Sequence, residues 1–464
     1  MSDGQETAAG QRVALWVTAL GSFLAPFMGS SINIALPVVG QELAADAVLL
    51  SWVGTAYSLS AATFLLPFGK VADMWGRKKV FAYGMAFYAL ASLLCGLAGS
   101  TGWLVAFRVL QGIGSTMVFG TGVAILTSVF PARERGRALG LNVTATYLGL
   151  SLGPFLGGFM TQSLGWRSIF FAQVPLGLLG VALVAWRLKG EWTGTGRGRF
   201  DWRGSLLYSL SLVVFMYGFP RLPAATGGLL AAGGVLGLVL FVAWETRAET
   251  PLVNTSLFRG NVTFTLSNLA ALINYSATSA VSFLLSLYLQ YIQGFSPQEA
   301  GVILVAQPVM MALFSSPAGR LSDRVEPRVV ASAGMALVAA GLLPFIFVNS
   351  ETSLLLVVGS LLVLGLGFAL FSSPNMNAIM GSVGQQHYGV ASAMVGTMRL
   401  LGQMLSMGVA TLILALYVGP VQITPDYHPP FIQSVRTAFV VFAALCVIGV
   451  FASLGRGKMR KGAG

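Results

Sequence analysis

Two arginines stand inside long runs of apolar residues, where a charge is costly. Arg108 lies near the start of its run, and Arg399 lies deeper in another. A guanidinium stays charged and carries five N–H donors, so in apolar surroundings it needs carbonyl oxygens, anions or aromatic rings as partners. Arg108 therefore either belongs to a functional site or extends along its helix to reach the interface. For Arg399, reaching the interface is harder, because its run continues on both sides.

Acidic residues, in contrast, avoid the interior of these runs. The 15 Asp and Glu residues all fall in the tails, in connecting segments or in the first turn of a run. A carboxylate inside an apolar run is the usual means of exchanging a proton for a cationic solute. The two histidines, His387 and His428, are expected in connecting segments and do not replace it. The pattern favours neutral or anionic lipophilic ligands, with Arg108 and Arg399 as positive walls of a cavity.

Uncharged polar residues within the runs add candidate contacts for such a ligand. Amides and phenols can donate and accept hydrogen bonds at a modest cost of desolvation. The alternative for each of them is a hydrogen bond between two neighbouring helices. The cavity candidates are Asn33, Tyr57, Tyr147, Gln173, Asn274 and Gln307, together with Gln111, which lies one helical turn after Arg108.

The elements that carry these residues are predicted to be membrane-spanning helices. The 464-residue chain is 55% hydrophobic and 9% charged, whereas soluble domains are about 25% charged. Its runs approach the length of about 20 residues that crosses a bilayer, and they lack the alternation of barrel strands. The sequence predicts an all-α polytopic membrane protein with fourteen spans, at residues 13–37, 51–69, 80–98, 102–129, 138–163, 168–186, 204–220, 227–244, 261–292, 299–318, 329–348, 354–375, 390–418 and 434–455.

Basic residues lie almost wholly on one side of these spans. Among the 27 Lys and Arg residues, the exceptions are Arg167, Arg221 and Arg436 on the other side, and Arg108 and Arg399 within spans. The positive-inside rule then places both termini in the cytoplasm of a multi-pass plasma-membrane protein. This asymmetry explains the net charge of +12, with attraction to anionic lipid as a secondary effect. A nucleic acid partner is not expected.

Two connecting segments repeat one pattern. Residues 69–78 read GKVADMWGRK and residues 319–328 read GRLSDRVEPR, and both follow the second span of a six-span block. Such a repeat indicates a duplication of six spans plus two plus six. The predicted domains are a cytoplasmic tail (1–12), a six-helix bundle (13–186), a linker with two additional helices (187–260), a second six-helix bundle (261–455) and a basic tail (456–464).

The repeated segments are candidate conformational latches. Gly69 would let two helices approach closely, and Asp73 can accept hydrogen bonds from a helix N-terminus or pair with Arg77. Such contacts can form in one state and break in another. A merely solvated loop is the alternative, but it would not be expected to recur at the equivalent place. The latch candidates are Gly69, Asp73 and Arg77, with Gly319, Asp323 and Arg324 in the repeat.

Two further glycine patterns complete a family resemblance. Residues 104–114 hold Arg108, Gln111 and Gly112, and residues 149–158 hold glycines four apart on one helix face. With the segment at 69–78, these resemble motifs A, B and C of the major facilitator superfamily, and specifically its fourteen-helix drug:proton antiporter branch. The resemblance implies a major-facilitator fold and alternating access, with export suggested by motif C. The motif C residues are Gly149, Gly153, Pro154, Gly157 and Gly158.

Each of these features also has a local interpretation. The motif C glycines and Pro154 let a helix bend and pack tightly, as a hinge or as packing alone. Ser296 and Glu299 form a capping box, so Glu299 is expected to be structural. The sequence departs from the branch at Met28, where related antiporters commonly carry an Asp, just before residues 33–37 (NIALP). This departure argues against the usual route of proton coupling and against cationic drugs.

The sequence therefore predicts a secondary active transporter that exports small amphipathic molecules or drugs by alternating access. The expected partners are the substrate, the bilayer and protons as a candidate coupling ion, with the protein acting as a monomer. An importer or uniporter of a neutral or anionic metabolite and a transporter-like sensor remain alternatives. An enzyme is not expected, because no catalytic set, metal-ligand spacing or phosphate-binding loop stands out; no cofactor or metal is predicted. A duplicated bundle also suits rocking better than a fixed channel.

Overall fold

The computed structural model describes residues 2–188, 190–192, 200–248, 251–253, 257–384 and 388–457. These residues form helices and connecting turns without a strand, so the all-α prediction is confirmed. Among them, thirteen helices or helix pairs are long and apolar enough to cross a membrane. The one predicted span missing from these thirteen, residues 204–220, corresponds to α7, a shorter helix of 17 residues. The chain divides into two compact units, one formed by residues 1–45 and 52–253 and the other by 46–51 and 254–464.

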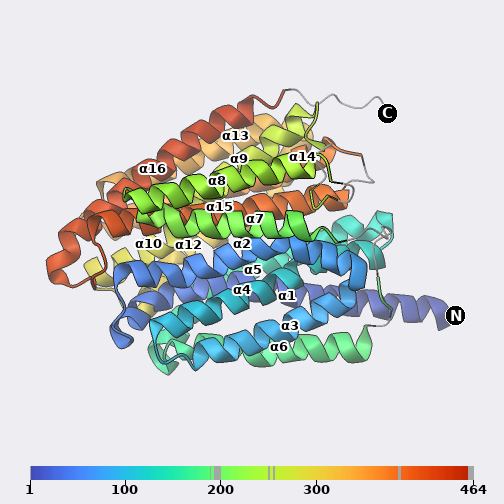
Figure 1. Cartoon of the computed structure of the whole chain (residues 1–464), viewed down its shortest axis with the longest axis horizontal. Coiled ribbons are helices and arrows are strands. Elements are labelled where there is room, and N and C mark those ends of the chain that lie inside the picture. The colour runs from blue at the N-terminus through green and yellow to red at the C-terminus, as the bar shows by residue number, and fades with distance from the viewer. Residues whose placement is uncertain are drawn as a thin grey trace. The chain divides into compact units, whose positions relative to one another are not determined.

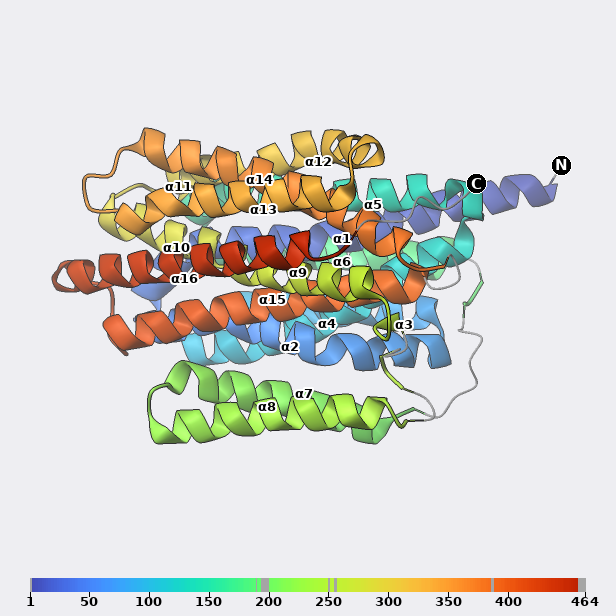
Figure 2. The same cartoon turned by 90° about the horizontal axis from the view of Figure 1, so that it is seen from above.

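The first unit contains eight α-helices among its described residues. In it, α1 packs mainly against α5, and α3 packs against α4 and α6. The helices α7 and α8 lie side by side as a hairpin, shown in green in Figures 1 and 2. The Tyr208 hydroxyl of α7 donates to the Ala62 carbonyl of α2 at 3.0 Å, which ties this hairpin to the rest of the unit. The bounds are α1 (Ser2–Glu42), α2 (Ala47–Trp75), α3 (Arg77–Gly96), α4 (Thr101–Val129), α5 (Ala132–Leu164), α6 (Arg167–Arg187), α7 (Trp202–Gly218) and α8 (Ala225–Glu245).

The second unit contains the remaining helices. Here α14 packs against α12 and α13, and α9 packs against α15 and α16. Buried Ala270, Ala331, Met335 and Phe371 form a core cluster between these helices. The bounds are α9 (Val262–Thr278), α10 (Val281–Leu287), a π-helical turn (Tyr288–Ile292), α11 (Pro297–Leu304), α12 (Ala306–Arg324), α13 (Pro327–Leu342), a 3-10 turn (Leu343–Phe347), α14 (Leu354–Gly381), α15 (Tyr388–Tyr417), a 3-10 turn (Pro425–Tyr427) and α16 (His428–Leu454).

Local sequence explains several helix ends. The Asp201 carboxylate accepts the Gly204 N–H at 2.9 Å and begins α7. Ser296 and Glu299 form the predicted capping box at the start of α11, with Pro297 as its first residue. Side-chain acceptors at these positions satisfy N–H groups that have no partner within the helix. The structural role expected for Glu299 therefore agrees with its contacts.

Some helices run further than their apolar runs. The second span was predicted to end at residue 69, but α2 continues to Trp75, so Asp73 lies inside a helix and Gly76 alone separates α2 from α3. Likewise α12 continues to Arg324. His428, expected in a connecting segment, is the first residue of α16, and His387 lies outside the described residues. A helix keeps its backbone hydrogen bonds when it leaves hydrocarbon for water, so hydropathy marks the bilayer boundary rather than the helix end.

Candidate functional site

Arg108 is enclosed by the first unit, with a side chain that is 1% exposed. Its Nε donates to the Val53 carbonyl of α2 at 3.1 Å, and its Nη1 donates to the Gln111 side-chain oxygen one turn along α4. The guanidinium carbon lies 4.3 Å from the centre of the Tyr57 ring. Carbonyl, amide and aromatic partners are those that a buried guanidinium needs. Arg108 is therefore held between α2 and α4, and it does not extend to the interface.

Two more side chains, both of serine, extend this network. The Gln111 amide nitrogen donates to the Ser92 hydroxyl of α3 at 2.8 Å, and the Tyr57 hydroxyl donates to the Ser115 hydroxyl of α4 at 2.8 Å. Gly112 allows α4 to lie this close to α2, because a Cβ at Gly112 would lie only 2.6 Å from the Tyr57 carbonyl oxygen. The motif B residues thus join α2, α3 and α4. Ser92 and Ser115 are not among the residues predicted from the sequence, since serines in apolar runs carry no pattern that distinguishes them.

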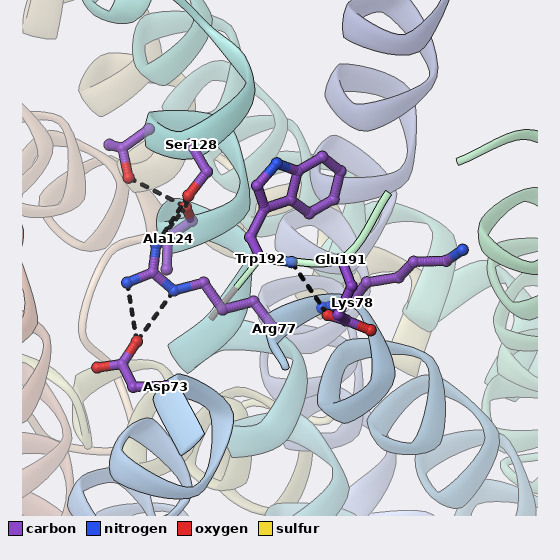
Figure 3. A network of polar contacts seen from close by, with 8 residues as sticks. Asp73, Arg77, Lys78, Ala124, Ser128, Glu191 and Trp192 are labelled. Carbon is purple, nitrogen blue, oxygen red and sulfur yellow. Dashed lines mark hydrogen bonds and ion pairs between the residues drawn. The ribbon is translucent and has the colours of Figure 1, made fainter. Parts of the chain in front are cut away.

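The motif A residues form a second polar cluster at the α2–α3 turn (Figure 3). The Asp73 carboxylate accepts from Arg77 Nε at 3.0 Å and from Arg77 Nη2 at 2.8 Å. The other arm of Arg77, Nη1, donates to the Ala124 carbonyl at 3.2 Å and to the Ser128 hydroxyl at 2.8 Å, both on α4. Arg77 thus binds α2 and α4 at once. Of the two contacts predicted for Asp73, the structure contains the pair with Arg77.

The remaining latch candidates are placed differently. A Cβ added at Gly69 would meet no atom within 4 Å, so the predicted close approach of two helices at Gly69 is not present. Gly69 lies within α2, six residues before the helix ends at Trp75, rather than at the turn between two helices. In the repeat, a Cβ at Gly319 would lie 2.8 Å from the Ser373 hydroxyl, so that glycine does approach a neighbouring helix. Asp323 and Arg324 are the last two residues of α12, and the Asp323 side chain lies outside the described part.

The motif C glycines line the contact between α5 and α1. A Cβ at Gly149 would lie 2.5 Å from the Phe23 carbonyl oxygen, and one at Gly157 would lie 2.7 Å from the Ser31 Cα. A Cβ at Gly153 would overlap the Ser30 hydroxyl. The Ser31 hydroxyl donates to the Gly153 carbonyl at 2.9 Å across the same seam. The three glycines therefore let two helices pack at backbone distance, with Pro154 inside α5.

Two cavity candidates are buried amides without a hydrogen-bond partner in the part of the chain that the structure describes. Gln173 of α6 and Asn274 of α9 are both 0% exposed, and neither amide oxygen nor nitrogen of either side chain is paired. A buried amide without a partner costs about 1–3 kcal/mol. Gln307 of α12 is also buried, whereas Asn33, Tyr57, Tyr147 and Arg399 are partly buried on α1, α2, α5 and α15. The first unit holds Asn33, Tyr57, Tyr147 and Gln173, and the second holds Asn274, Gln307 and Arg399.

Acidic residues lie at the ends of the described helices. Glu42 is the last residue of α1, Asp73 lies in the last turn of α2, and Glu245 ends α8. These positions are helical, unlike the expectation of tails, connecting segments and first turns, because the helices extend past the apolar runs. Met28 is 0% exposed within α1. Among the described residues, no group of three or more His, Cys, Asp and Glu could hold a metal ion.

Comparison with known proteins gives consistent matches. The sequence model of the Major Facilitator Superfamily matches residues 18–248 and 268–461. Riboflavin transporter RibZ of Clostridioides difficile is 27% identical over 441 residues, covering 94% of this chain and 96% of that protein. The cephamycin export protein CmcT of Amycolatopsis lactamdurans is 31% identical over 436 residues, covering 90% of this chain and 88% of that protein.

A third relative and a solved structure agree with these matches. Multidrug resistance protein Stp of Mycobacterium tuberculosis is 30% identical over 414 residues, covering 88% of this chain and 76% of that protein. Among solved structures, a bacterial homologue of the human lysosomal transporter Spinster superposes with a TM-score of 0.68 at 16% identity. The superposition covers 96% of this chain and 97% of that chain. At this identity the superposition bears on the fold.

Proposed function

Because the chain belongs to the Major Facilitator Superfamily, we propose that it exports small amphipathic molecules or drugs by alternating access. The chain is a multi-pass membrane transporter rather than an enzyme. The observation that carries export is the α1–α5 seam, where motif C glycines bring two helices to backbone distance. Relatives named for cephamycin export and multidrug resistance support the same direction. In this proposal both termini lie in the cytoplasm, and residues 13–186 and 261–455 are the two six-helix domains.

The substrate class follows from the charges in the membrane. Arg108 is a buried cation whose described partners, Val53, Gln111 and Tyr57, are all uncharged. Among the described residues, no carboxylate lies in the middle of a membrane-spanning helix, and the uncharged Met28 is buried in α1 where the family resemblance leads us to expect an Asp. A positive field without a balancing acid favours anionic and neutral solutes over cations. We therefore propose neutral or anionic amphiphiles as substrates, with Gln173 and Asn274 among the residues that bind them.

The direction of transport can be tested in cells. Cells that produce the protein should accumulate less of a fluorescent neutral amphiphile than cells that produce the Gly153→Val variant. In that variant the valine side chain prevents the close packing of α5 against α1. Equal accumulation in both strains would remove the support for export. The control is Gly140→Val, because Gly140 lies on the same helix and its Cβ would meet nothing within 4 Å.

Import or uniport of a neutral metabolite is the second candidate function. The similarity over 94% of this chain to a protein named as a riboflavin transporter supports a metabolite as the transported solute. Higher accumulation of the amphiphile in producing cells than in the Gly153→Val strain would support this candidate and overturn export.

A further inference from the structure

A short segment after α6 reaches back to the motif A cluster. Residues 190–192, here called the strap, follow α6 in the sequence, and Glu191 and Trp192 lie beside Arg77 and Lys78 at the start of α3 in Figure 3. We propose that Glu191 and Trp192 of the strap are positioning residues of the latch, which hold Arg77 in the geometry that binds α4. This inference rests on the proposed transport function and adds a part that no motif of the sequence contains.

The strap binds the backbone at the start of α3. The Arg77 N–H donates to the Trp192 carbonyl at 2.8 Å, and the Lys78 N–H donates to a Glu191 carboxylate oxygen at 2.9 Å. The residue before the helix is Gly76, which has no side chain and so cannot supply a cap. The first N–H groups of a helix need external acceptors and favour a negative charge. Glu191 supplies this acceptor from 113 residues away in the sequence.

Two glycines give the strap its path. Gly76 has a φ of 112°, in the region that favours glycine, and a Cβ there would overlap the Glu191 carboxyl group. Gly190 has a φ of 89°, and its Cβ position lies 3.5 Å from the Trp192 ring. Both positive φ values are costly for residues with a Cβ. The turn and the strap are therefore fitted to each other at backbone level.

The Trp192 ring anchors the strap on the helices. It packs against a buried apolar cluster that includes Ala14 and Val17 of α1, Phe81 of α3 and Val184 of α6. A tryptophan side chain has only two side-chain dihedral angles, so packing the ring against this cluster fixes the Trp192 backbone carbonyl at a low entropic cost. The strap is thus fixed to α1, α3 and α6, and α3 begins with the latch residue Arg77.

Arg77 contacts both the strap and the other latch residues. Its backbone N–H binds Trp192, while its side chain binds Asp73 and Ser128. Movement of the α3 start away from the strap would displace the guanidinium from α4. Loss of the strap contacts should therefore lower turnover, as loss of the Arg77 side chain does. The two losses share one cause, because the strap acts on transport by positioning that side chain.

The test combines hydrogen exchange with a double-mutant cycle in the full-length protein. In Glu191→Ala, the amides of Arg77 and Lys78 should exchange about tenfold faster, the scale expected for a lost helix cap. Turnover should fall with an unchanged KM, and Glu191→Ala should add little to Arg77→Ala. Glu191→Gln keeps an acceptor oxygen and should restore most of the protection. The control is Glu134→Ala, an exposed acid in the first turn of α5, which should leave exchange at these amides unchanged.

The outcomes separate the strap from the proposed function. Unchanged exchange at Arg77 and Lys78 in Glu191→Ala would overturn the capping contact, whatever the protein transports. Additive losses of turnover in the double variant would overturn the action through Arg77. If the unsubstituted protein moves no amphiphile, the proposed function fails, and the exchange data still decide whether the strap holds α3. Trp192→Ala should repeat both effects by removing the anchor.

Discussion

Replacement of Arg108 by glutamine tests the role of the buried charge. Arg108→Gln removes the cation but keeps a polar side chain beside Gln111. The described partners of Arg108 are uncharged, so no opposite charge is left without a partner. Removal of the guanidinium also removes its desolvation cost. We therefore expect folded protein in normal yield and a defect confined to charged substrates.

The size of the defect follows from Coulomb's law. We take a distance of about 8 Å between the guanidinium and a bound anion and an effective dielectric constant of about 20. The attraction between the two unit charges is then roughly 2 kcal/mol. That energy corresponds to about thirtyfold in apparent affinity. A neutral molecule of the same shape gains nothing from this attraction.

The assay uses two substrates that differ only in charge. Transport of an amphipathic carboxylic acid and of its primary amide is measured in proteoliposomes. Arg108→Gln should raise the KM for the acid about thirtyfold and leave the KM for the amide unchanged. Arg135→Gln, an exposed arginine of α5, should change neither value. Equal losses for acid and amide would refute the electrostatic argument and indicate a packing role for Arg108.

Three further substitutions, two of them with a control variant, test the α1–α5 seam, the latch and the buried amide. Gly153→Ala should abolish most transport and lower the free energy of unfolding by about 1–3 kcal/mol, because the new Cβ overlaps the Ser30 side chain. The control Gly140→Ala should change neither quantity. Transport assays and thermal denaturation measure the two effects. Arg77→Ala should lower turnover by breaking the contacts with α4, whereas Gly69→Ala should leave turnover unchanged, and a loss in Gly69→Ala would contradict the structure. Gln173→Leu should keep or raise the unfolding temperature, because the buried amide has no described hydrogen-bond partner. The same substitution should lower substrate affinity. A fall in the unfolding temperature would show that the amide does form stabilising hydrogen bonds.

Hydropathy and charge predict most of this fold, because lipid imposes helices and lysine and arginine mark one side. Helix ends are less predictable. The continuation of α2 to Trp75 passes through polar residues that hydropathy excludes from a span. Gly69 lies inside this helix, and a Cβ added there would meet no described atom within 4 Å. Pro67 inside α2 likewise does not end the helix.

The site was predictable where residues are close in sequence. Asp73 and Arg77 are four residues apart, so one helical turn brings them together. The Glu191 contact spans 113 residues and depends on the path of the chain after α6, for which the local sequence has no signal. The unpaired amides of Gln173 and Asn274 are visible only once the packing around them is known.

The most direct test of the central claim is transport in proteoliposomes with the pH gradient and the membrane potential imposed separately. The substrates are the amphipathic acid, its amide and the cation ethidium. We expect the protein to transport the acid and the amide and to exclude ethidium under either gradient. Robust ethidium transport driven by the pH gradient, with cations preferred, would contradict it.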